Sequence, residues 1–256
     1  MRIIRLLLSA LTLLTALPTA AQDELEANVQ VDFVSKYMWR GQELGHISIQ
    51  PMAGLSWRGL GFSVSGSTGL DKDDSDEIDV TLGYEYSGFN VGLTDYWTSG
   101  QDYDGRDRYF FFDKAESAHQ LEANIGYSCQ WFSLQAYTFV WGNDFRYDTY
   151  RDSKYRVNGK RAFSTYIELG IPFYMAGLDW DIKAGVTPFK SACTRDIRED
   201  PTYYYADKLA FVMASARATK NFELGDMKVP VFAEFHANPY TQKAFFLVGI
   251  SVIPFK

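Results

Sequence analysis

The chain has 256 residues, with 25 Lys and Arg against 32 Asp and Glu, for a net charge of −7 at pH 7. This acidic balance argues against nucleic acid as a partner. Aromatic residues make up 16% of the sequence and charged residues 22%, a combination that suits a chain facing lipid on one side and water on the other.

The first 21 residues predict a secretory signal peptide. Arg2 and Arg5 supply the positive segment, residues 6–17 the apolar segment, and 19–21 a cleavage site of small residues. The apolar run is shorter than the ~20 residues of a membrane-spanning helix, so we do not expect an anchor. Without the two arginines, the mature domain at 22–256 holds 23 basic and 32 acidic residues, a net charge of −9.

Apolar and polar residues alternate with period 2 through most of the mature chain. In "DEIDVTLGYEYS", Val80 and Leu82 share one face, while Asp79 and Thr81 share the other. Strands of a soluble sandwich are typically about 5–6 residues long. The segments here are about twice that length and match the ~9–11 residues of a tilted membrane strand.

Twelve such strands are predicted. The connections after the even-numbered strands are tight, and those after the odd-numbered strands are mostly longer. The strands span 27–40, 46–57, 60–70, 76–86, 88–98, 117–129, 131–142, 160–172, 175–189, 208–220, 226–237 and 243–255. Membrane barrels have short periplasmic turns and long outer loops. The pattern therefore predicts an all-β fold: one closed antiparallel transmembrane β-barrel of about 12 strands, in the outer membrane of a Gram-negative cell.

The first strand is expected to place Trp39 in the aromatic belt at the outer membrane interface. Arg40 would then point into the mouth of the lumen, and Gly41 would begin the first outer loop. Five further aromatic residues are expected in the belt at the inner interface: Trp57, Tyr86, Phe89, Phe132 and Phe255.

The stretch "SKYMWRG" at 35–41, followed by Gln50-Pro51 and Gly54, resembles the N-terminal signature of the TorF-like porin family. The resemblance is carried by residues 27–70, and beyond them only length and pattern agree. It implies an outer-membrane barrel of about this size and carries over no substrate or catalytic residue. The chain departs from the family where "QELGH" follows Gly41 in place of a Ser/Thr-rich stretch.

The sequence predicts no catalytic site, metal site or cofactor. His46 and Ser48 have the spacing of a barrel lipase pair, but the predicted phase puts both in the lumen, away from lipid. His236 and Glu234 share a face, yet two ligands are too few for Zn²⁺. His119 falls on the apolar face near the outer rim. A lipid hydrolase is therefore the third hypothesis for function.

The predicted function lies in the lumen, which both signs of charge are expected to line. The predicted pore-lining residues are Asp32, Lys36, Arg40, Asp79, Glu85, Glu122, Glu168, Asp179, Asp181, Lys183, Arg217, Lys228, Glu234 and His236. Such charges can select ions in a channel or pair and plug a narrow barrel. We expect a porin-like channel for passive passage of small polar solutes, leaning toward cations because acids outnumber bases. The alternative is a plugged structural barrel whose loops bind a partner or a saccharide.

The expected partners are outer-membrane lipid, lipopolysaccharide and a small polar solute. Tyr109 to Phe112 are too apolar for full solvation, so they should fold into the mouth or against the membrane interface. Cys129 falls at an inner turn and Cys193 in an outer loop. The two thiols are therefore expected to be free.

Overall fold

A computed structural model describes residues 25–100, 108–113, 117–149, 155–194 and 202–254. The predicted signal peptide and Phe255 lie outside these ranges. Within them, no helix is long and apolar enough to cross a membrane.

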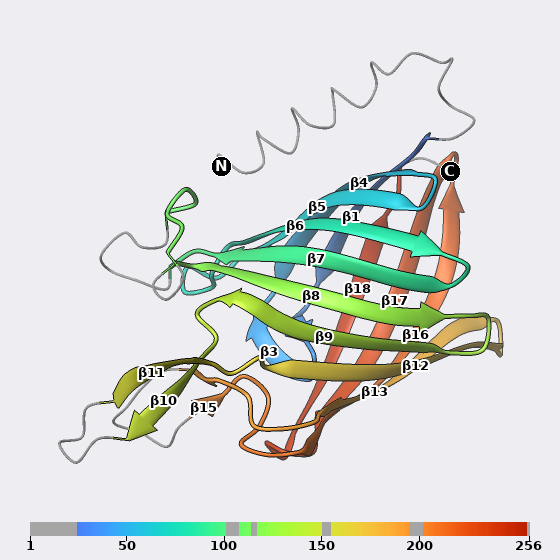
Figure 1. Ribbon diagram of the computed structural model, residues 1–256. Helices are drawn as coiled ribbons and strands as arrows, with labels where there is room; N and C mark the ends of the chain where they lie inside the picture. The colour runs from blue at the N-terminus through green and yellow to red at the C-terminus, as the bar shows by residue number, and fades with distance from the viewer. Residues whose placement is uncertain (1–24, 101–107, 114–116, 150–154, 195–201, 255–256) are drawn as a thin grey trace.

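Twelve antiparallel strands form a closed barrel, which confirms the predicted fold (Figure 1). Around the barrel the order is β1-β18-β17-β16-β13-β12-β9-β8-β7-β6-β5-β4, and β1 closes it by pairing with both β18 and β4. The strands are β1 (Leu25–Val34), β4 (Ser48–Trp57), β5 (Leu60–Gly69), β6 (Glu77–Tyr86), β7 (Phe89–Thr98), β8 (His119–Ser128), β9 (Ser133–Gly142), β12 (Thr165–Met175), β13 (Leu178–Thr187), β16 (Ala210–Leu224), β17 (Met227–Asn238) and β18 (Lys243–Val252).

The two ends of the barrel differ, and we call them the turn end and the loop end. At the turn end, Arg58-Gly59, Ser87-Gly88 and Ala176-Gly177 each have two consecutive positive φ angles. Two positive φ angles define the type I′ turn, which suits the twist of paired strands. A side chain at Gly59 would lie 2.2 Å from the Glu85 carbonyl oxygen, so glycine is required there.

Three two-stranded sheets arise at the loop end. They are β2 (Tyr37–Trp39) with β3 (Gln42–Gly45), β10 (Phe145–Thr149) with β11 (Tyr155–Arg161), and β14 (Cys193–Thr194) with β15 (Thr202–Tyr203). In Figure 1, β10 and β11 extend beyond the barrel, whereas β3 is drawn within its outline.

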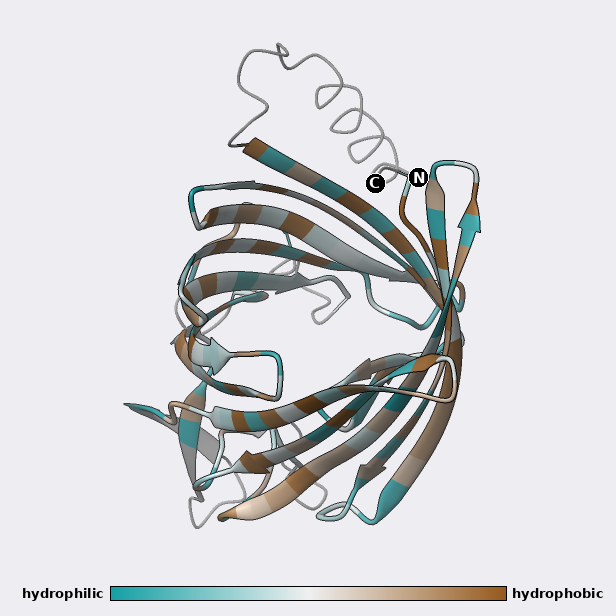
Figure 2. Ribbon diagram, turned by 90° about the vertical axis from the view of Figure 1, so that its right-hand side faces the viewer, coloured by the Kyte–Doolittle hydropathy of each residue, from teal (hydrophilic) through white to brown (hydrophobic). Residues whose placement is uncertain are grey.

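Hydrophobic and hydrophilic residues alternate along the strands of the barrel wall, as Figure 2 shows. The large apolar side chains are exposed on the outer face. On β6, Leu82 is 51% exposed and lies between Phe62 and Leu93 of the neighbouring strands, which are also exposed. Thr81 points the other way and shares a hydrogen bond of 3.0 Å with Thr94. At the turn end, the outer face carries exposed Trp57, Tyr86, Phe89 and Phe132.

The prediction that the first strand continues to residue 40 is wrong. β1 ends at Val34, and Ser35 fixes the bend through two hydrogen bonds with the backbone of Val248. Arg40 and Gly41 then form the turn of the β2–β3 hairpin, with φ angles of 48° and 80°. Because the hairpin folds into the lumen, Trp39 is not in the lipid-facing belt.

The tenth predicted strand is longer than expected. The sequence "NFELG" was predicted as a connection, but β16 continues to Leu224 and pairs with β17 as far as Met227. Asn221 donates to the Asp179 carboxylate at 2.6 Å, which joins this extension to β13. The connection is therefore as tight as the other turns at this end.

The two cysteines are expected to remain unpaired, as the topology also indicates. Cys129 is free and lies at the turn end, between β8 and β9, whereas Cys193 lies in β14 at the loop end. A membrane barrel separates its ends by roughly 25 Å, while a disulfide needs Cα atoms within about 7 Å. Alkylation without prior reduction should therefore modify both thiols, and a Cys129–Cys193 peptide in non-reducing mass mapping would contradict this topology.

Candidate functional site

The β2–β3 hairpin crosses the lumen and is held by an ion pair to the far wall. Arg40 Nη1 and Nη2 donate to the two carboxylate oxygens of Glu122 on β8, at 2.6 and 2.7 Å. On the shorter way around the barrel, four strands separate β8 from β1. The side chains are only 8% and 2% exposed. A β-bulge beside Glu122 breaks the β8–β9 register at this point, as bulges often do next to functional sites.

Aromatic rings enclose the Arg40 guanidinium. Its Cζ lies 4.5 Å from the ring centre of Trp39, 4.2 Å from that of Tyr137 and 4.8 Å from that of Tyr166. These contacts are within cation–π range. Burial alone would lower the pKa of Arg40, but Tyr205 and Glu122 raise it well above its usual value, so the group stays charged.

A second segment, Tyr204-Tyr205, narrows the lumen from the loop before β16. Tyr205 is buried, stacks on Trp39 with ring centres 5.8 Å apart, and accepts a hydrogen bond from Arg40 Nη1 at 2.6 Å. Gln42 of the hairpin donates to the Tyr204 carbonyl oxygen at 2.6 Å. The hairpin and this segment therefore form one constriction near the loop end.

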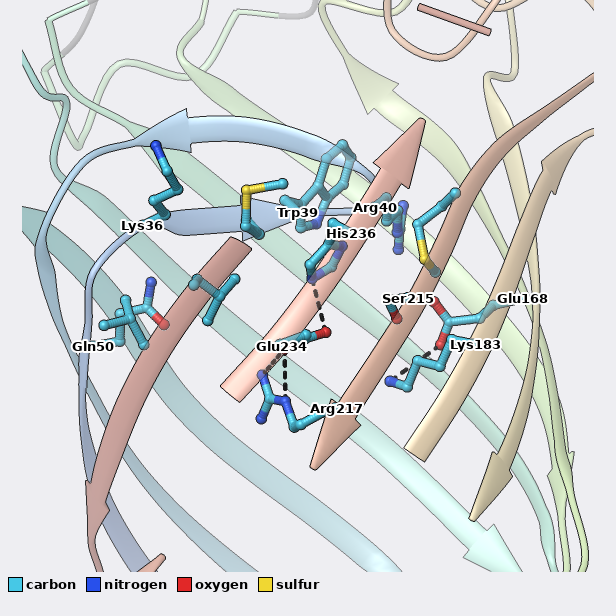
Figure 3. A pocket seen from close by; sticks show the side chains of 14 residues that line it. Lys36, Trp39, Arg40, Gln50, Glu168, Lys183, Ser215, Arg217, Glu234 and His236 are labelled. Carbon is cyan, nitrogen blue, oxygen red and sulfur yellow. Dashed lines mark hydrogen bonds and ion pairs between the residues drawn. The ribbon is translucent and has the colours of Figure 1, made fainter. Parts of the chain in front are cut away.

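Trp39 lines a cavity on each side of the constriction. The loop-end cavity has a volume of about 310 Å³ and is bordered by residues at strand ends, among them Glu77 and Gln120. The mid-barrel cavity, of about 200 Å³, lies along β12, β13, β16 and β17 (Figure 3). Trp39 is the one lining residue that the two cavities share.

The mid-barrel cavity contains a charged network (Figure 3). Glu234 accepts from Arg217 Nε and lies 2.7 Å from His236 Nε2. On the neighbouring wall, Lys183 Nζ lies 3.4 Å from Glu168 and 3.6 Å from Asp181. Basic groups outnumber acidic groups on this cavity surface.

The opposite wall, on β6, is acidic. The Tyr37 hydroxyl donates to Glu77, and Ser65 donates to Asp79 at 3.1 Å. No basic group in the described part of the chain forms an ion pair with either carboxylate. The overall excess of acids therefore conceals a separation of charge, with acids on β6 and bases around the mid-barrel cavity.

Seven of the fourteen predicted pore-lining residues meet at the mid-barrel cavity: Lys36, Arg40, Glu168, Lys183, Arg217, Glu234 and His236. Glu122 anchors Arg40. The other six lie on inward-facing positions away from this cavity, as strand register indicates: Asp32, Asp79, Glu85, Asp179, Asp181 and Lys228. Whether these residues line a conducting pore stays a prediction.

The aromatic part of the site was not predicted from the sequence. Tyr96, Tyr137, Tyr166 and Tyr205 surround the constriction, together with Trp39, which was assigned to the lipid interface. One signal was available, because Arg40-Gly41 repeats the dipeptide of the tight turn at Arg58-Gly59. It would have predicted a hairpin, but not its inward direction.

His46 and Ser48, which have the spacing of a barrel lipase pair, have separate partners in the structure. His46 is exposed and its Nδ1 lies 3.0 Å from Asp74, while buried Ser48 accepts from Gln50. On the outer face, His119 Nδ1 lies 2.8 Å from Asp95, and its Nε2 lies 2.5 Å from the Tyr109 carbonyl oxygen. Both nitrogens of this buried ring are thus occupied. In the described residues, no three His, Cys, Asp or Glu side chains are grouped to hold a metal.

The segment 108–113 covers His119 on the outer face of the barrel. Tyr109 and Phe112 contact the imidazole ring edge-on and stacked, and Tyr109 also contacts Trp97. Phe110 and Phe112 are 86% and 61% exposed. The segment therefore lies against the outer face of the barrel through these contacts, and its contact with the membrane interface stays a prediction.

No protein-family model matches the chain, and no curated protein matches it by sequence. Among solved structures, the chain is similar to the NanC porin, with 10% identity over 90% of this chain and 100% of the other, at a TM-score of 0.42. It is also similar to Salmonella typhi OmpF, with 11% identity over 89% and 96%, at a TM-score of 0.35. BamA from Haemophilus ducreyi shares 12% identity over 84% and 41%, at a TM-score of 0.34. Likeness at this level concerns the fold alone, and the resemblance to TorF-like porins stays a prediction.

Proposed function

We propose that this protein is a narrow outer-membrane channel for the passive passage of small polar solutes. The observation that carries the proposal is the inward β2–β3 hairpin, which leaves a cavity with polar lining on each side of Trp39. A barrel that served only as a scaffold would gain more from filling this space with apolar side chains, because packing stabilises an interior.

The outer surface supports a membrane location. Large apolar side chains are exposed on eleven of the twelve barrel strands, among them Phe62, Leu93, Leu134, Ile171 and Phe246. Exposed apolar surface of this extent is unfavourable in water and marks a lipid or protein contact. With lipid around the barrel, the turn end would face the periplasm and the loop end the exterior.

The second candidate is a plugged barrel whose loops bind a partner. It is favoured by the burial of the Arg40–Glu122 pair, which is nearly inaccessible to water, and by the position of Trp39 between the cavities. In this case the hairpin would close the lumen permanently. The channel proposal instead requires a path past Trp39 for water and small solutes.

Conductance across a planar lipid bilayer separates the two functions. The purified, folded protein is expected to produce uniform single-channel steps in KCl that are smaller than those of wide porins, because the hairpin narrows the lumen. Heat-modifiable gel mobility would show that the same preparation is folded. A folded protein that gives no steps would contradict the channel and favour the plugged barrel.

A further inference from the structure

The mid-barrel cavity has more hydrogen-bond donors than acceptors available to a ligand. Both carboxylate oxygens of Glu234 are occupied, one by Arg217 and the other by His236 Nε2. One carboxylate oxygen of Glu168 accepts a hydrogen bond of 2.9 Å from the Tyr166 hydroxyl, and the other faces Lys183. The acidic groups that line this cavity therefore already have partners.

The donors are only partly used. Arg217 contacts Glu234 through Nε and Nη2, and among the described residues its Nη1 has no partner. Lys183 Nζ stays 3.4 and 3.6 Å from its two carboxylates, beyond the usual length of an N–H···O hydrogen bond. On paired strands, Lys183 lies opposite Ser215 and Arg217 lies two residues further on. Two cations thus lie diagonally across β13 and β16 and face the same space.

His236 adds a specific requirement. Its side chain is 9% exposed, and Nδ1 is buried without a hydrogen-bond partner in the described structure. Since Nε2 contacts a carboxylate, Nε2 holds the proton in the neutral ring and Nδ1 is an acceptor. A buried acceptor left unpaired is costly. A ligand with a hydroxyl group beside its negative charge would satisfy Nδ1.

We propose that the mid-barrel cavity is a binding site for a small oxyanion that carries a hydroxyl group, a hydroxycarboxylate or a hydrogen phosphate. Arg217 and Lys183 would donate to the anionic oxygens, and His236 would accept from the hydroxyl. A volume of about 200 Å³ limits the ligand to a small molecule. The proposal deepens the channel function, on which it rests for the route by which the anion arrives, and it replaces the expected preference for cations.

The test measures binding to the folded protein in detergent micelles, with glycolate and inorganic phosphate as separate probes and chloride at equal ionic strength as the reference. A probe that binds the site should raise the thermal unfolding temperature as its concentration increases, until the site is saturated, because a ligand that binds only the folded state stabilises it. Lys183→Met should weaken binding by about tenfold, the effect of losing one hydrogen bond to a charged group. The matched control is Lys243→Met, which removes a lysine at the exposed loop-end start of β18.

A response to glycolate alone or to phosphate alone would identify which oxyanion the site takes. Equal weakening by the two methionine variants would reveal a general effect of charge and overturn the site, as would no saturable response to either probe. Saturable binding by a barrel that shows no conductance would contradict the channel and leave the site intact. Conductance without saturable binding would overturn the binding site and leave the channel proposal intact. The two proposals can therefore fail separately.

Discussion

Glu122→Gln is expected to release the β2–β3 hairpin and to raise single-channel conductance. The substitution removes the charge that faces Arg40 across two hydrogen bonds, in a pair only 8% and 2% exposed. Breaking a buried pair while leaving one charge behind costs about 3–5 kcal/mol. At about 1.4 kcal/mol per factor of ten, this would lower the ratio of docked to released hairpin by roughly two orders of magnitude or more. The measurement is conductance in a planar bilayer.

Glu43→Gln is the matched control, because it makes the same chemical change in another ion pair that involves the segment from residue 35 to the end of β3. Glu43 pairs with Lys36, and both side chains are about one-third exposed at 29% and 32%. Such a pair contributes at most ~1 kcal/mol, so this variant should conduct like the parent. If both variants conduct equally and fold normally by gel mobility, the buried pair does not hold the constriction.

Much of the barrel could be predicted because each strand lies between two solvents. The outward Leu82 and inward Thr81 of β6 follow directly from the alternation. The breaks in the alternation also locate the tight connections at Arg58-Gly59 and Ser87, although Gly88 belongs to the turn and not to the next strand. The errors lie at strand ends. β16 continues past its predicted end because the polar residue Asn221, which resembled a loop residue, finds a partner on β13.

The constriction could not be predicted in the same way, because it depends on contacts between residues far apart in the chain. Arg40 and Glu122 are 82 positions apart, and Arg40 and Tyr205 are 165 apart. Alternation shows that Glu122 and Tyr137 face inward, but it does not show that a hairpin from across the barrel meets them. A count of charges fails similarly, since it cannot separate the acids of β6 from the bases around the mid-barrel cavity.

Arginine placed on the two faces of β6 is expected to have opposite consequences for folding. Leu82→Arg puts a cation on lipid between Phe62 and Leu93, at a cost of about 2–4 kcal/mol near the bilayer midplane. Thr81→Arg puts the same charge in the wet lumen. It loses only the hydrogen bond with Thr94, worth about 1 kcal/mol. Urea unfolding in lipid vesicles, followed by gel mobility, measures both costs.

Val80→Arg provides a further control on the same face, because the neighbours of Val80 are Val64 and Asp95 in place of Phe62 and Leu93. Val80 also faces outward, but Asp95 of β7 lies directly opposite it, with its side chain 28% exposed. An arginine at this position would therefore meet a carboxylate, and the loss of stability should be smaller than for Leu82→Arg. Equal losses for Leu82→Arg and Thr81→Arg would mean that β6 is buried on both faces, contrary to a membrane barrel. An equal loss for Val80→Arg and Leu82→Arg would show instead that Asp95 offers no compensation on the lipid side.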